Sequence, residues 1–369
     1  MHRRSMVALT LGTAAVLTLS ACGGSSSDDP STDGGSDAKV GKVGVILPDT
    51  ASSTRWEQQD RPELTAAFQA AGVESDIQNA QGDKNKFQSI ADGMINEGVS
   101  VLLITDLDAG SGTAVIKKAT AAGIPVIDYD RLTLGGGAKY YVSFDNVAVG
   151  TAIGEGLVKC LKDDGVTSGG VIELDGSPTD NNATLFKEGY DKAIKDAGYT
   201  VAAEQAVADW DNTVAATNFT QLDTKTKGEY VGVAAANDGL GGAVISRLKA
   251  NGTAGKIPVT GQDASIEGLQ RLLQGTQCVS VFKAVKKEAA AAAELAIALA
   301  KGDTAAADAV ATGTVQDTEL NTPVKSVLLT PEPIFQDNVQ DVIDGGGTTA
   351  DKICTTEELK KLCTEHNVG

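Results

Sequence analysis

Histidine is almost absent from this chain. Only His2 and His366 occur among 369 residues, and His366 is close to the C-terminus. A Ser-His-Asp or Cys-His catalytic site and most zinc sites need an imidazole inside the site. The sequence therefore excludes these classes unless the last residues fold into a cleft, and we expect no metal and no cofactor. Hydrolases that use a pair of carboxylates remain an alternative.

Basic residues are also in deficit. The chain has 31 Lys and Arg against 49 Asp and Glu, which gives a net charge of −18. Nucleic-acid binding needs clustered Lys and Arg, so a nucleic-acid partner is excluded. Hydrophobic residues make up 41% of the chain, which is enough for packed cores and argues against wholesale disorder. The length predicts about two domains.

The apolar run near the N-terminus is too short to span a bilayer. It follows the basic residues His2, Arg3 and Arg4 and covers residues 7–21, whereas a membrane helix needs about 20 apolar residues. We therefore interpret residues 1–21 as an export signal peptide.

The end of this segment predicts a lipid anchor. Its last residues, LSAC (19–22), resemble a bacterial lipobox, in which Cys22 takes the lipid; the alternative is an ordinary cleavage site before a chance cysteine. Residues 22–40 are rich in Gly, Ser and Asp, a composition typical of a flexible tether. Together these segments predict a lipoprotein lipid-anchored to the cell membrane of a bacterium, on its extracytoplasmic face.

From residue 42 onward, short apolar runs alternate with amphipathic stretches. Continuous apolar runs are typical of strands covered on both faces, and helices between them are typical of βαβ crossovers. The pattern predicts an α/β fold with two similar lobes, each a parallel sheet flanked by helices. The expected strands are 43–47, 73–77, 99–104, 125–129, 140–144, 170–174, 201–207, 230–235, 258–260 and 278–282.

Polar side chains follow many of these strands. Ligands of open parallel sheets bind beyond the carboxyl ends of the strands, so these side chains are candidates for one site. Taken singly, Asp130 and Arg131 could form a surface ion pair, and Asp180 and Asn237 could cap helices. Their concentration at one edge of both sheets favours a site. The candidates are Arg55, Trp56, Asp130, Arg131, Asp180, Asn182, Asn237, Asp263 and Lys283.

This mixture of side chains suits a small, neutral, polyhydroxylated ligand. Carboxylates accept hydrogen bonds from hydroxyl groups, Arg and Lys donate, amides do both, and a planar Arg can grip two adjacent oxygens. The formal charges of three Asp, two Arg and one Lys cancel, as 3 − 3 = 0, which disfavours an anionic ligand. The two Trp of the chain, Trp56 and Trp210, can cover the C–H faces of a sugar, although Trp210 could also be a core aromatic.

Seven segments resemble the D-xylose-binding and multiple-sugar-binding receptors of ABC importers, which are type I periplasmic-binding proteins. The resemblance runs in order from about residue 41 to 335. Departures are the glycine triplet in 128–137 and the segment AVADWDN (206–212), which matches only around Trp210. The segments are SSTRW (52–56), IDYDR (127–131), YVSFDN (141–146), DGSPTDNNA (175–183), AANDG (235–239), TGQDA (260–264) and VSVFK (279–283).

The resemblance implies a two-lobed type I periplasmic-binding protein fold joined by a three-strand hinge. We expect an N-terminal lobe from 41–145 and 284–315 and a C-terminal lobe from 146–283 and 316–345. The tail, 346–369, has no counterpart. Carried over position by position, the polar candidates resemble the hydrogen-bonding ring around the sugar, with Trp56 and Trp210 as stacking partners.

The function implied is that of a receptor and not of an enzyme. It would capture a monosaccharide, D-xylose first among the aldoses, act as a monomer and deliver the sugar to an ABC permease and its ATPase subunit. Another aldose, such as glucose, galactose or arabinose, is an alternative. A carboxylate-based glycoside hydrolase is disfavoured because interleaved Arg and Lys lower carboxylate pKa values. A sugar-responsive repressor is excluded because the N-terminus offers no basic DNA-binding segment.

Four cysteines remain beyond Cys22. An exported protein meets an oxidising environment, which favours disulfides, although four cysteines allow three connectivities. Cys354 and Cys363 flank a short helical segment, and Cys160 and Cys278 lie at the ends of strands and helices away from the expected ligand edge. We predict bridges Cys354–Cys363 and Cys160–Cys278, both structural. For the second pair, two separately buried thiols are the alternative.

Overall fold

The computed structural model describes residues 40–369. The predicted signal peptide, the predicted lipidation site Cys22 and residues 23–39 of the predicted tether lie outside the described residues. Within 40–369, none of the helices combines the length and the apolar character needed to cross a membrane.

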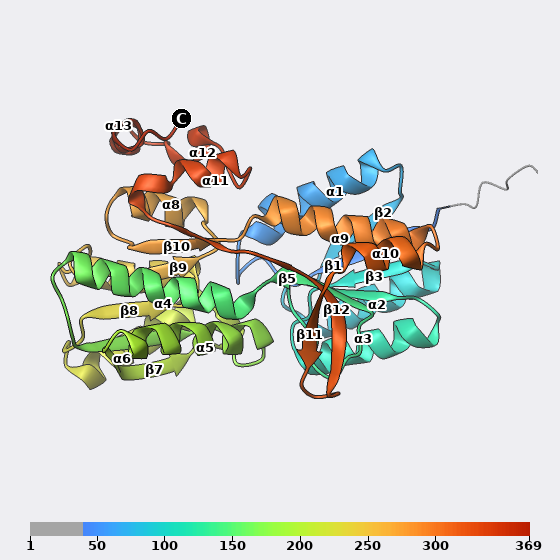
Figure 1. Cartoon of the computed structure of the whole chain (residues 1–369), viewed down its shortest axis with the longest axis horizontal. Helices are drawn as coiled ribbons and strands as arrows, with labels where there is room; N and C mark the ends of the chain where they lie inside the picture. The colour runs from blue at the N-terminus through green and yellow to red at the C-terminus, as the bar shows by residue number, and fades with distance from the viewer. Residues whose placement is uncertain (1–39) are drawn as a thin grey trace, which may run out of the picture. The chain divides into compact units, whose positions relative to one another are not determined.

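Seven strands form the sheet of the N-terminal lobe, in the order β11-β12-β5-β4-β3-β1-β2 (Figure 1). All neighbours are parallel except β11 and β12. Strands β1, β3, β4 and β5 are buried along their whole length, as expected for a sheet covered on both faces. The strands are β1 (Val43–Leu47), β2 (Ser75–Asn79), β3 (Val101–Ile104), β4 (Val126–Tyr129), β5 (Tyr140–Phe144), β11 (Gly313–Asp317) and β12 (Thr322–Leu329).

Helices cover both faces of this sheet. Helices α1, α9 and α10 pack their apolar side chains on one face, with Leu64, Phe68 and Leu295 in that core. Helices α2 and α3 build the core of the other face around Phe87 and Ile116. The helices are the π-helix η1 (Trp56–Asp60), α1 (Arg61–Ala70), α2 (Lys84–Glu97), α3 (Ala109–Ala121), α9 (Val285–Ala300) and α10 (Thr304–Val310).

The C-terminal lobe contains two three-stranded sheets, β7-β6-β8 and β13-β10-β9. A parallel bridge between Val233 and Val259 joins them. The strands are β6 (Gly170–Asp175), β7 (Thr200–Ala206), β8 (Gly232–Ala235), β9 (Thr260–Gln262), β10 (Val279–Phe282) and β13 (Glu332–Ile334). The helices are α4 (Asn146–Asp163), α5 (Asn181–Asp196), the 3-10 helix η2 (Ala208–Trp210), α6 (Asn212–Thr226), α7 (Asp238–Ala250), α8 (Ile266–Leu273) and the 3-10 helix η3 (Gln336–Asn338).

Helices α4 and α5 approach each other closely through glycine. A Cβ atom at Gly150 would lie 2.0 Å from the carbonyl oxygen of Phe186, and one at Gly189 would lie 2.4 Å from the backbone nitrogen of Thr151. Any larger side chain would push the helices apart. This contact fixes the N-terminus of α5, which carries two of the candidate site residues.

The chain passes between the lobes three times, at β5 to α4, β10 to α9 and β12 to β13. Two of these passages lie side by side, because the backbone nitrogen of Asp145 donates to the carbonyl oxygen of Leu329 over 2.9 Å. Two α/β lobes built mainly from parallel strands, with three crossings of the chain between them, confirm the predicted fold class.

One predicted boundary is wrong. Residues 316–329 were expected in the C-terminal lobe, but β12 pairs with β5 of the N-terminal lobe, from Lys325–Tyr140 to Leu329–Phe144. β11 then pairs antiparallel with β12 and extends the same sheet. The chain therefore enters the C-terminal lobe for the last time only after Leu329.

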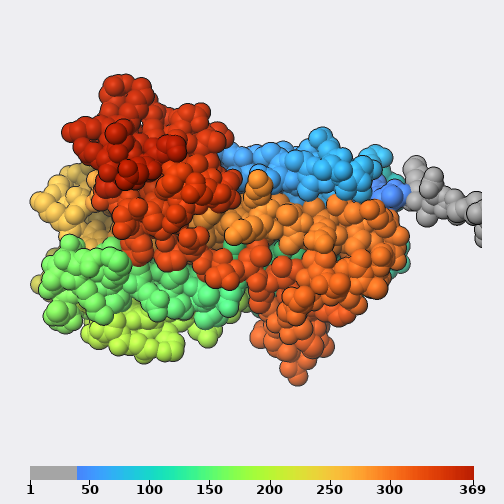
Figure 2. Space-filling view, turned by 45° about the horizontal axis from the view of Figure 1, so that its top comes forward, coloured from blue at the N-terminus to red at the C-terminus, as the bar shows by residue number. Residues whose placement is uncertain are grey.

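Helix α11 (Gln340–Asp344) precedes the tail, 346–369, which forms α12 (Ala350–Ile353) and α13 (Glu357–Glu365). The tail packs on the C-terminal lobe, because Ile353 and Cys363 are buried in a core shared with α8 and Phe282. Figure 2 shows the tail, in red, lying on the C-terminal lobe. Both expected bridges are present, with Cα–Cα distances of 6.2 Å for Cys354–Cys363 and 6.3 Å for Cys160–Cys278.

Candidate functional site

The strand ends of the two lobes enclose one small polar cavity of about 30 Å³. A water molecule needs about 10–15 Å³ by a comparable measure, so the side chains fill most of the space between the lobes. All ten residues that the sequence predicted line this cavity: Arg55, Trp56, Asp130, Arg131, Asp180, Asn182, Trp210, Asn237, Asp263 and Lys283. The structure adds four that were missed, Ser52, Ser53, Phe186 and Gln262.

Two of the lining aspartates have a positive backbone φ angle. Asp130, directly after β4, has φ +63°, and Asp263, directly after β9, has φ +98°. Positive φ is uncommon for residues with a Cβ, although Asp and Asn adopt it more often than most, and backbone strain of this kind clusters at functional sites. At Asp130 the backbone is fixed further, because its carbonyl oxygen accepts hydrogen bonds from Tyr141, Ser143 and Asn182.

Arg55 is held almost completely by the protein. Its Nε and Nη2 donate to Asp60 over 2.9 and 2.7 Å, Nη2 also donates to Glu288 over 2.6 Å, and Nη1 donates to Asp130 over 2.9 Å. A guanidinium has five N–H groups, so a single Nη1 N–H remains for a ligand. Arg55 cannot grip two ligand oxygens while it keeps these partners. The guanidinium also lies over the ring of Trp56, 4.5 Å from its centre.

Lys283 lies between the carboxylates of Asp130 and Asp263. Its Nζ lies 3.1 Å from Asp130 and 3.7 Å from Asp263. Burial raises the pKa of Asp130, but the charges of Lys283, Arg55 and Arg131 outweigh it and hold that pKa well below its usual range. Asp263 also accepts a hydrogen bond from Ser53 over 3.0 Å. Asp130 and Ser53 belong to the N-terminal lobe and Asp263 to the other, so these contacts join the lobes.

Arg131 makes a second connection between the lobes. Its Nε lies 3.0 Å from Oδ2 of Asp180, and its Nη1 donates to the backbone carbonyl of Asp106 over 3.0 Å. Oδ1 of Asp180 accepts from the backbone nitrogen of Asn182 and so caps α5. Asp180 is therefore a helix cap, which is one of the two interpretations that the sequence left open, and it also lines the cavity.

Asn237 also serves two purposes. Its Oδ1 accepts from the backbone nitrogen of Leu240 and caps α7, while its Nδ2 donates to the carbonyl oxygen of Ser52 in the N-terminal lobe. A capping side chain at the end of a parallel strand thus also faces the other lobe.

Both tryptophans line the cavity and both indole nitrogens are satisfied. Trp210 donates to Oδ2 of Asp180 over 3.1 Å, and Trp56 donates to Ser52 over 3.1 Å. The ring of Trp210 packs edge to face with Phe186 and rests on Gly176, where a Cβ atom would lie 2.1 Å from the ring. Aromatic faces therefore border a cavity otherwise made of charged and amide groups.

Further acidic groups lie behind the lining residues. Asp60, Asp106 and Glu288 are buried and add three carboxyls to a ring whose formal charges cancel. Burial raises the pKa of Asp106 to about 7, although Arg131 opposes this, and burial raises the pKa of Glu288 to about 8, although Arg55 opposes it. The site is therefore surrounded by an excess of acid, part of which is protonated near neutral pH.

Comparison with known proteins identifies the family. Residues 43–304 match the periplasmic binding protein domain. This chain belongs to the periplasmic binding proteins.

Relatives of known description support this assignment. The chain is 34% identical to the D-xylose-binding periplasmic protein of Escherichia coli K12 over 310 residues, which cover 83% of this chain and 90% of the relative. It is 32% identical to the multiple sugar-binding periplasmic receptor ChvE of Rhizobium radiobacter, over 86% and 93% of the two chains. These are binding proteins and not enzymes, which removes the glycoside hydrolase as an alternative.

A solved structure agrees with the fold. An ABC transporter solute binding protein from Clostridium phytofermentans with bound β-D-glucose has a TM-score of 0.75 and 28% identity, covering 85% of this chain and 99% of that chain. Its similarity confirms the type I periplasmic-binding fold predicted from the sequence.

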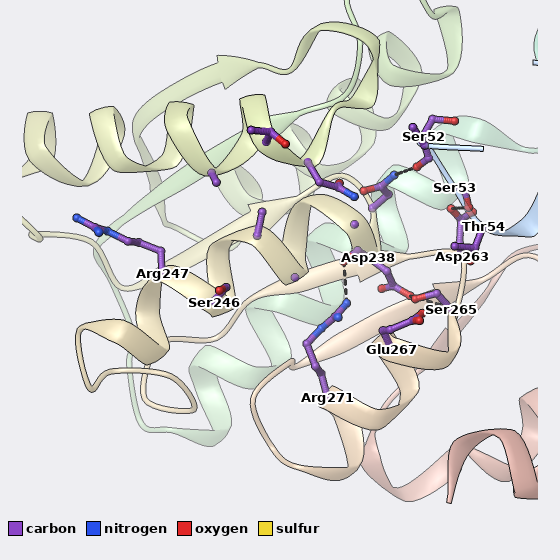
Figure 3. Close-up of a pocket in the computed structure, with 18 of the residues that line it drawn as sticks. Ser52, Ser53, Thr54, Asp238, Ser246, Arg247, Asp263, Ser265, Glu267 and Arg271 are labelled. Atoms are coloured by element: carbon purple, nitrogen blue, oxygen red, sulfur yellow. Dashed lines mark hydrogen bonds between the residues drawn. The ribbon is translucent and has the colours of Figure 1, made fainter. Parts of the chain in front are cut away.

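This periplasmic binding protein has a second, larger cavity of about 810 Å³ beside the first (Figure 3). It lies along α6, α7 and α8, with Ser52, Ser53 and Thr54 at one end and Arg247 at the other. No aromatic residue lines it, and its buried acid, Asp238, is satisfied by Ser265, Gln277 and Ser280. The smaller cavity, with two indoles and converging charges, is therefore the candidate site.

Proposed function

We propose that this periplasmic binding protein captures a free aldose, D-xylose first, between its two lobes and delivers it to an ABC permease and its ATPase subunit. The observation that carries the proposal is the composition of the small cavity. Acceptors (Asp130, Asp180), donors (Lys283 and one N–H of Arg55) and an amide (Asn182) lie within reach of one another in a cavity that two indole rings also line. A sugar needs each of these partners, because every hydroxyl both donates and accepts.

Sugar capture in this arrangement requires the lobes to separate. A cavity of about 30 Å³ is far smaller than the ~300–1,000 Å³ of typical small-molecule sites. The contacts Lys283–Asp130, Arg131–Asp180 and Ser53–Asp263 join the lobes directly. Sugar hydroxyls replace part of these contacts when the cleft closes on the ligand, so the sugar stabilises the closed state by its differential affinity for it.

The acidic groups behind the ring argue for a neutral ligand. Asp60 and Glu288 both contact Arg55, so this cation is already paired. A phosphate group needs an Arg or Lys whose charge is not already paired, whereas Arg55, Arg131 and Lys283 are each paired with a carboxylate. We therefore propose a free sugar and not a sugar phosphate.

D-xylose is the first choice because two relatives at 32–34% identity, from Escherichia coli and Haemophilus influenzae, are described as D-xylose-binding periplasmic proteins. The structural neighbour with β-D-glucose makes glucose the main competitor. Both sugars are pyranoses that differ at C5, where D-xylose has no hydroxymethyl group.

Calorimetric titration of residues 40–369 with a panel of sugars tests the proposal. We expect one sugar per chain, with D-xylose bound more tightly than glucose, galactose or arabinose, and no binding of α-D-xylose 1-phosphate, which keeps the pyranose ring. Absence of binding by every free aldose, or binding of the phosphate as tight as that of D-xylose, would overturn the proposal.

We propose further that Cys22 anchors the mature, monomeric protein to the membrane. The support is the lipobox-like LSAC (19–22) and the tether-like composition after it. In a bacterial host that processes lipoproteins, we expect the full chain in the detergent phase of a Triton X-114 partition and Cys22→Ala in the aqueous phase. An unchanged partition of Cys22→Ala would contradict the anchor.

A further inference from the structure

Glu288 lies immediately behind the candidate site. It is in the first turn of α9 and is fully buried, but it does not line the cavity. Its Oε2 accepts a hydrogen bond from Nη2 of Arg55 over 2.6 Å. Its Oε1, although buried, has no hydrogen-bond partner within residues 40–369. Within residues 40–369, its hydrogen bond to the lining of the site is therefore the one with Arg55.

Three carboxyl groups share this one guanidinium. Asp60 occupies Nε and Nη2, Asp130 occupies Nη1, and Glu288 occupies the remaining N–H of Nη2. Burying a third carboxylate anion around one cation, with one of its oxygens unpaired, costs free energy. Burying a neutral carboxyl group there costs much less. The titratable groups that face Glu288 from neighbouring elements are Arg55, Asp60, Tyr129, Asp130, Tyr141 and Lys283.

The ionisation behaviour agrees with this geometry. Burial raises the pKa of Glu288 to about 8, and the charge of Asp130 adds to this, although Arg55 and Lys283 oppose it. Glu288 is thus largely protonated at pH 7 and ionises as the pH rises through about 8.

We propose that Glu288 is a positioning residue that carries a proton in the sugar-binding state. As a neutral carboxyl it accepts one N–H of Arg55 and leaves Nη1 directed at Asp130 and the cavity. When Glu288 ionises, it competes with Asp130 for the same guanidinium, draws Arg55 away from the cavity and weakens sugar binding. The inference rests on the proposed function, since it concerns the affinity for the same sugar.

The direction and size of the effect follow from linkage. A group that must be protonated for binding lowers the affinity by the factor 1 + 10^(pH − pKa). With a pKa of about 8, the dissociation constant for D-xylose changes little between pH 6 and 7 and rises about tenfold by pH 9. Binding at pH 8.5 also takes up protons from the buffer.

Two variants separate this role from a merely structural one. Glu288→Gln keeps an acceptor for Arg55 but is neutral at every pH, so it should match the parent at pH 6–7 and lose the decline toward pH 9. Glu173→Gln is the matched control, because Glu173 is buried, pairs with Lys187 in the C-terminal lobe and has a pKa raised by burial to about 8. Its pH profile should be that of the parent.

The experiment is calorimetric titration with D-xylose from pH 6 to 9, repeated at pH 8.5 in buffers of different ionisation enthalpy. Proton uptake by the parent tests the proposal even if Glu288→Gln does not fold. A parent affinity independent of pH without proton uptake, or the same decline in Glu288→Gln, would overturn the inference and leave the proposed function standing. Failure of the parent to bind any aldose at any pH would overturn both.

Discussion

Removal of the Arg131 side chain is the most informative single change in the site. Arg131 is 7% exposed and Asp180 is 6% exposed, and the Nε–Oδ2 distance of 3.0 Å joins the lobes. Arg131→Ala leaves the Asp180 carboxylate inside the cleft without its counter-charge. Breaking a buried ion pair by removing one partner costs about 3–5 kcal/mol.

The structure places the free-energy cost of Arg131→Ala near the lower end of that range. Asp180 keeps hydrogen bonds from the indole of Trp210 and the backbone of Asn182, which stabilise its charge in part. A loss of about 3 kcal/mol corresponds to an increase of more than about a hundredfold in the dissociation constant. Arg131→Lys retains the charge but not the planar fork, so its loss should be intermediate.

The assay is calorimetric titration with D-xylose, with thermal unfolding as the check that each variant is folded. Arg247→Ala is the control, since Arg247 is an exposed residue of α7 outside the small cavity, and its affinity should equal that of the parent. A folded Arg131→Ala that binds D-xylose within threefold of the parent would refute the reasoning.

Further changes test the aromatic wall and the tail. Trp210→Phe keeps a ring but loses the hydrogen bond to Asp180, which is worth about 1 kcal/mol, so titration should show roughly a fivefold weaker affinity. Gly176→Ala forces the ring of Trp210 to move, because its Cβ would lie 2.1 Å from the ring, and we expect a larger loss than for Trp210→Phe; an unchanged affinity would contradict this packing. Replacing Cys354 and Cys363 together by Ser removes a bridge with a sequence separation of 9 and should lower the free energy of unfolding by about 2–3 kcal/mol, measured by urea unfolding, without changing sugar affinity; a weaker affinity would show that the tail acts on the site.

The sequence predicts the lining of the site because the geometry of parallel sheets fixes the position of residues that follow each strand. Strand ends meet at one edge, so residues that directly follow β4 or β10, such as Asp130 and Lys283, are placed by the strands themselves. Asp180 and Asn237 looked equally like helix caps, and they are caps. One residue can do both because crossover helices begin at the ligand edge.

The groups behind the lining could not be placed from the sequence. Glu288 reaches Arg55 across 233 residues of chain, and only the packing of α9 on the N-terminal lobe brings them together. The signal that could have found it is its spacing in the alanine-rich helix VKKEAAAAAELAIALA, where Glu288 lies on the same face as the buried Ala292 and Leu295, whereas the second acid of the helix, Glu294, does not. Asp60 lies five residues after Arg55, but its contact depends on the π-helical turn at Trp56–Asp60.

The strand β12 was assigned to the wrong lobe for a related reason. Its burial is irregular, and several of its residues are exposed, so its apolar pattern does not identify the strand with which it pairs. Pairing with β5 is a long-range property that depends on the path of the whole chain. The tail is similar, since the partners of its apolar residues lie on α8 and Phe282.

A crystal structure of residues 40–369 with D-xylose tests the central claim most directly. We predict one pyranose between the indole rings of Trp56 and Trp210, with hydroxyl groups bonded to Asp130, Arg131 and Lys283 and with Arg55 still held by Asp60 and Glu288. A sugar bound instead in the larger cavity along α6, α7 and α8, or a closed cleft in which Asp130 and Lys283 contact no sugar, would contradict the account.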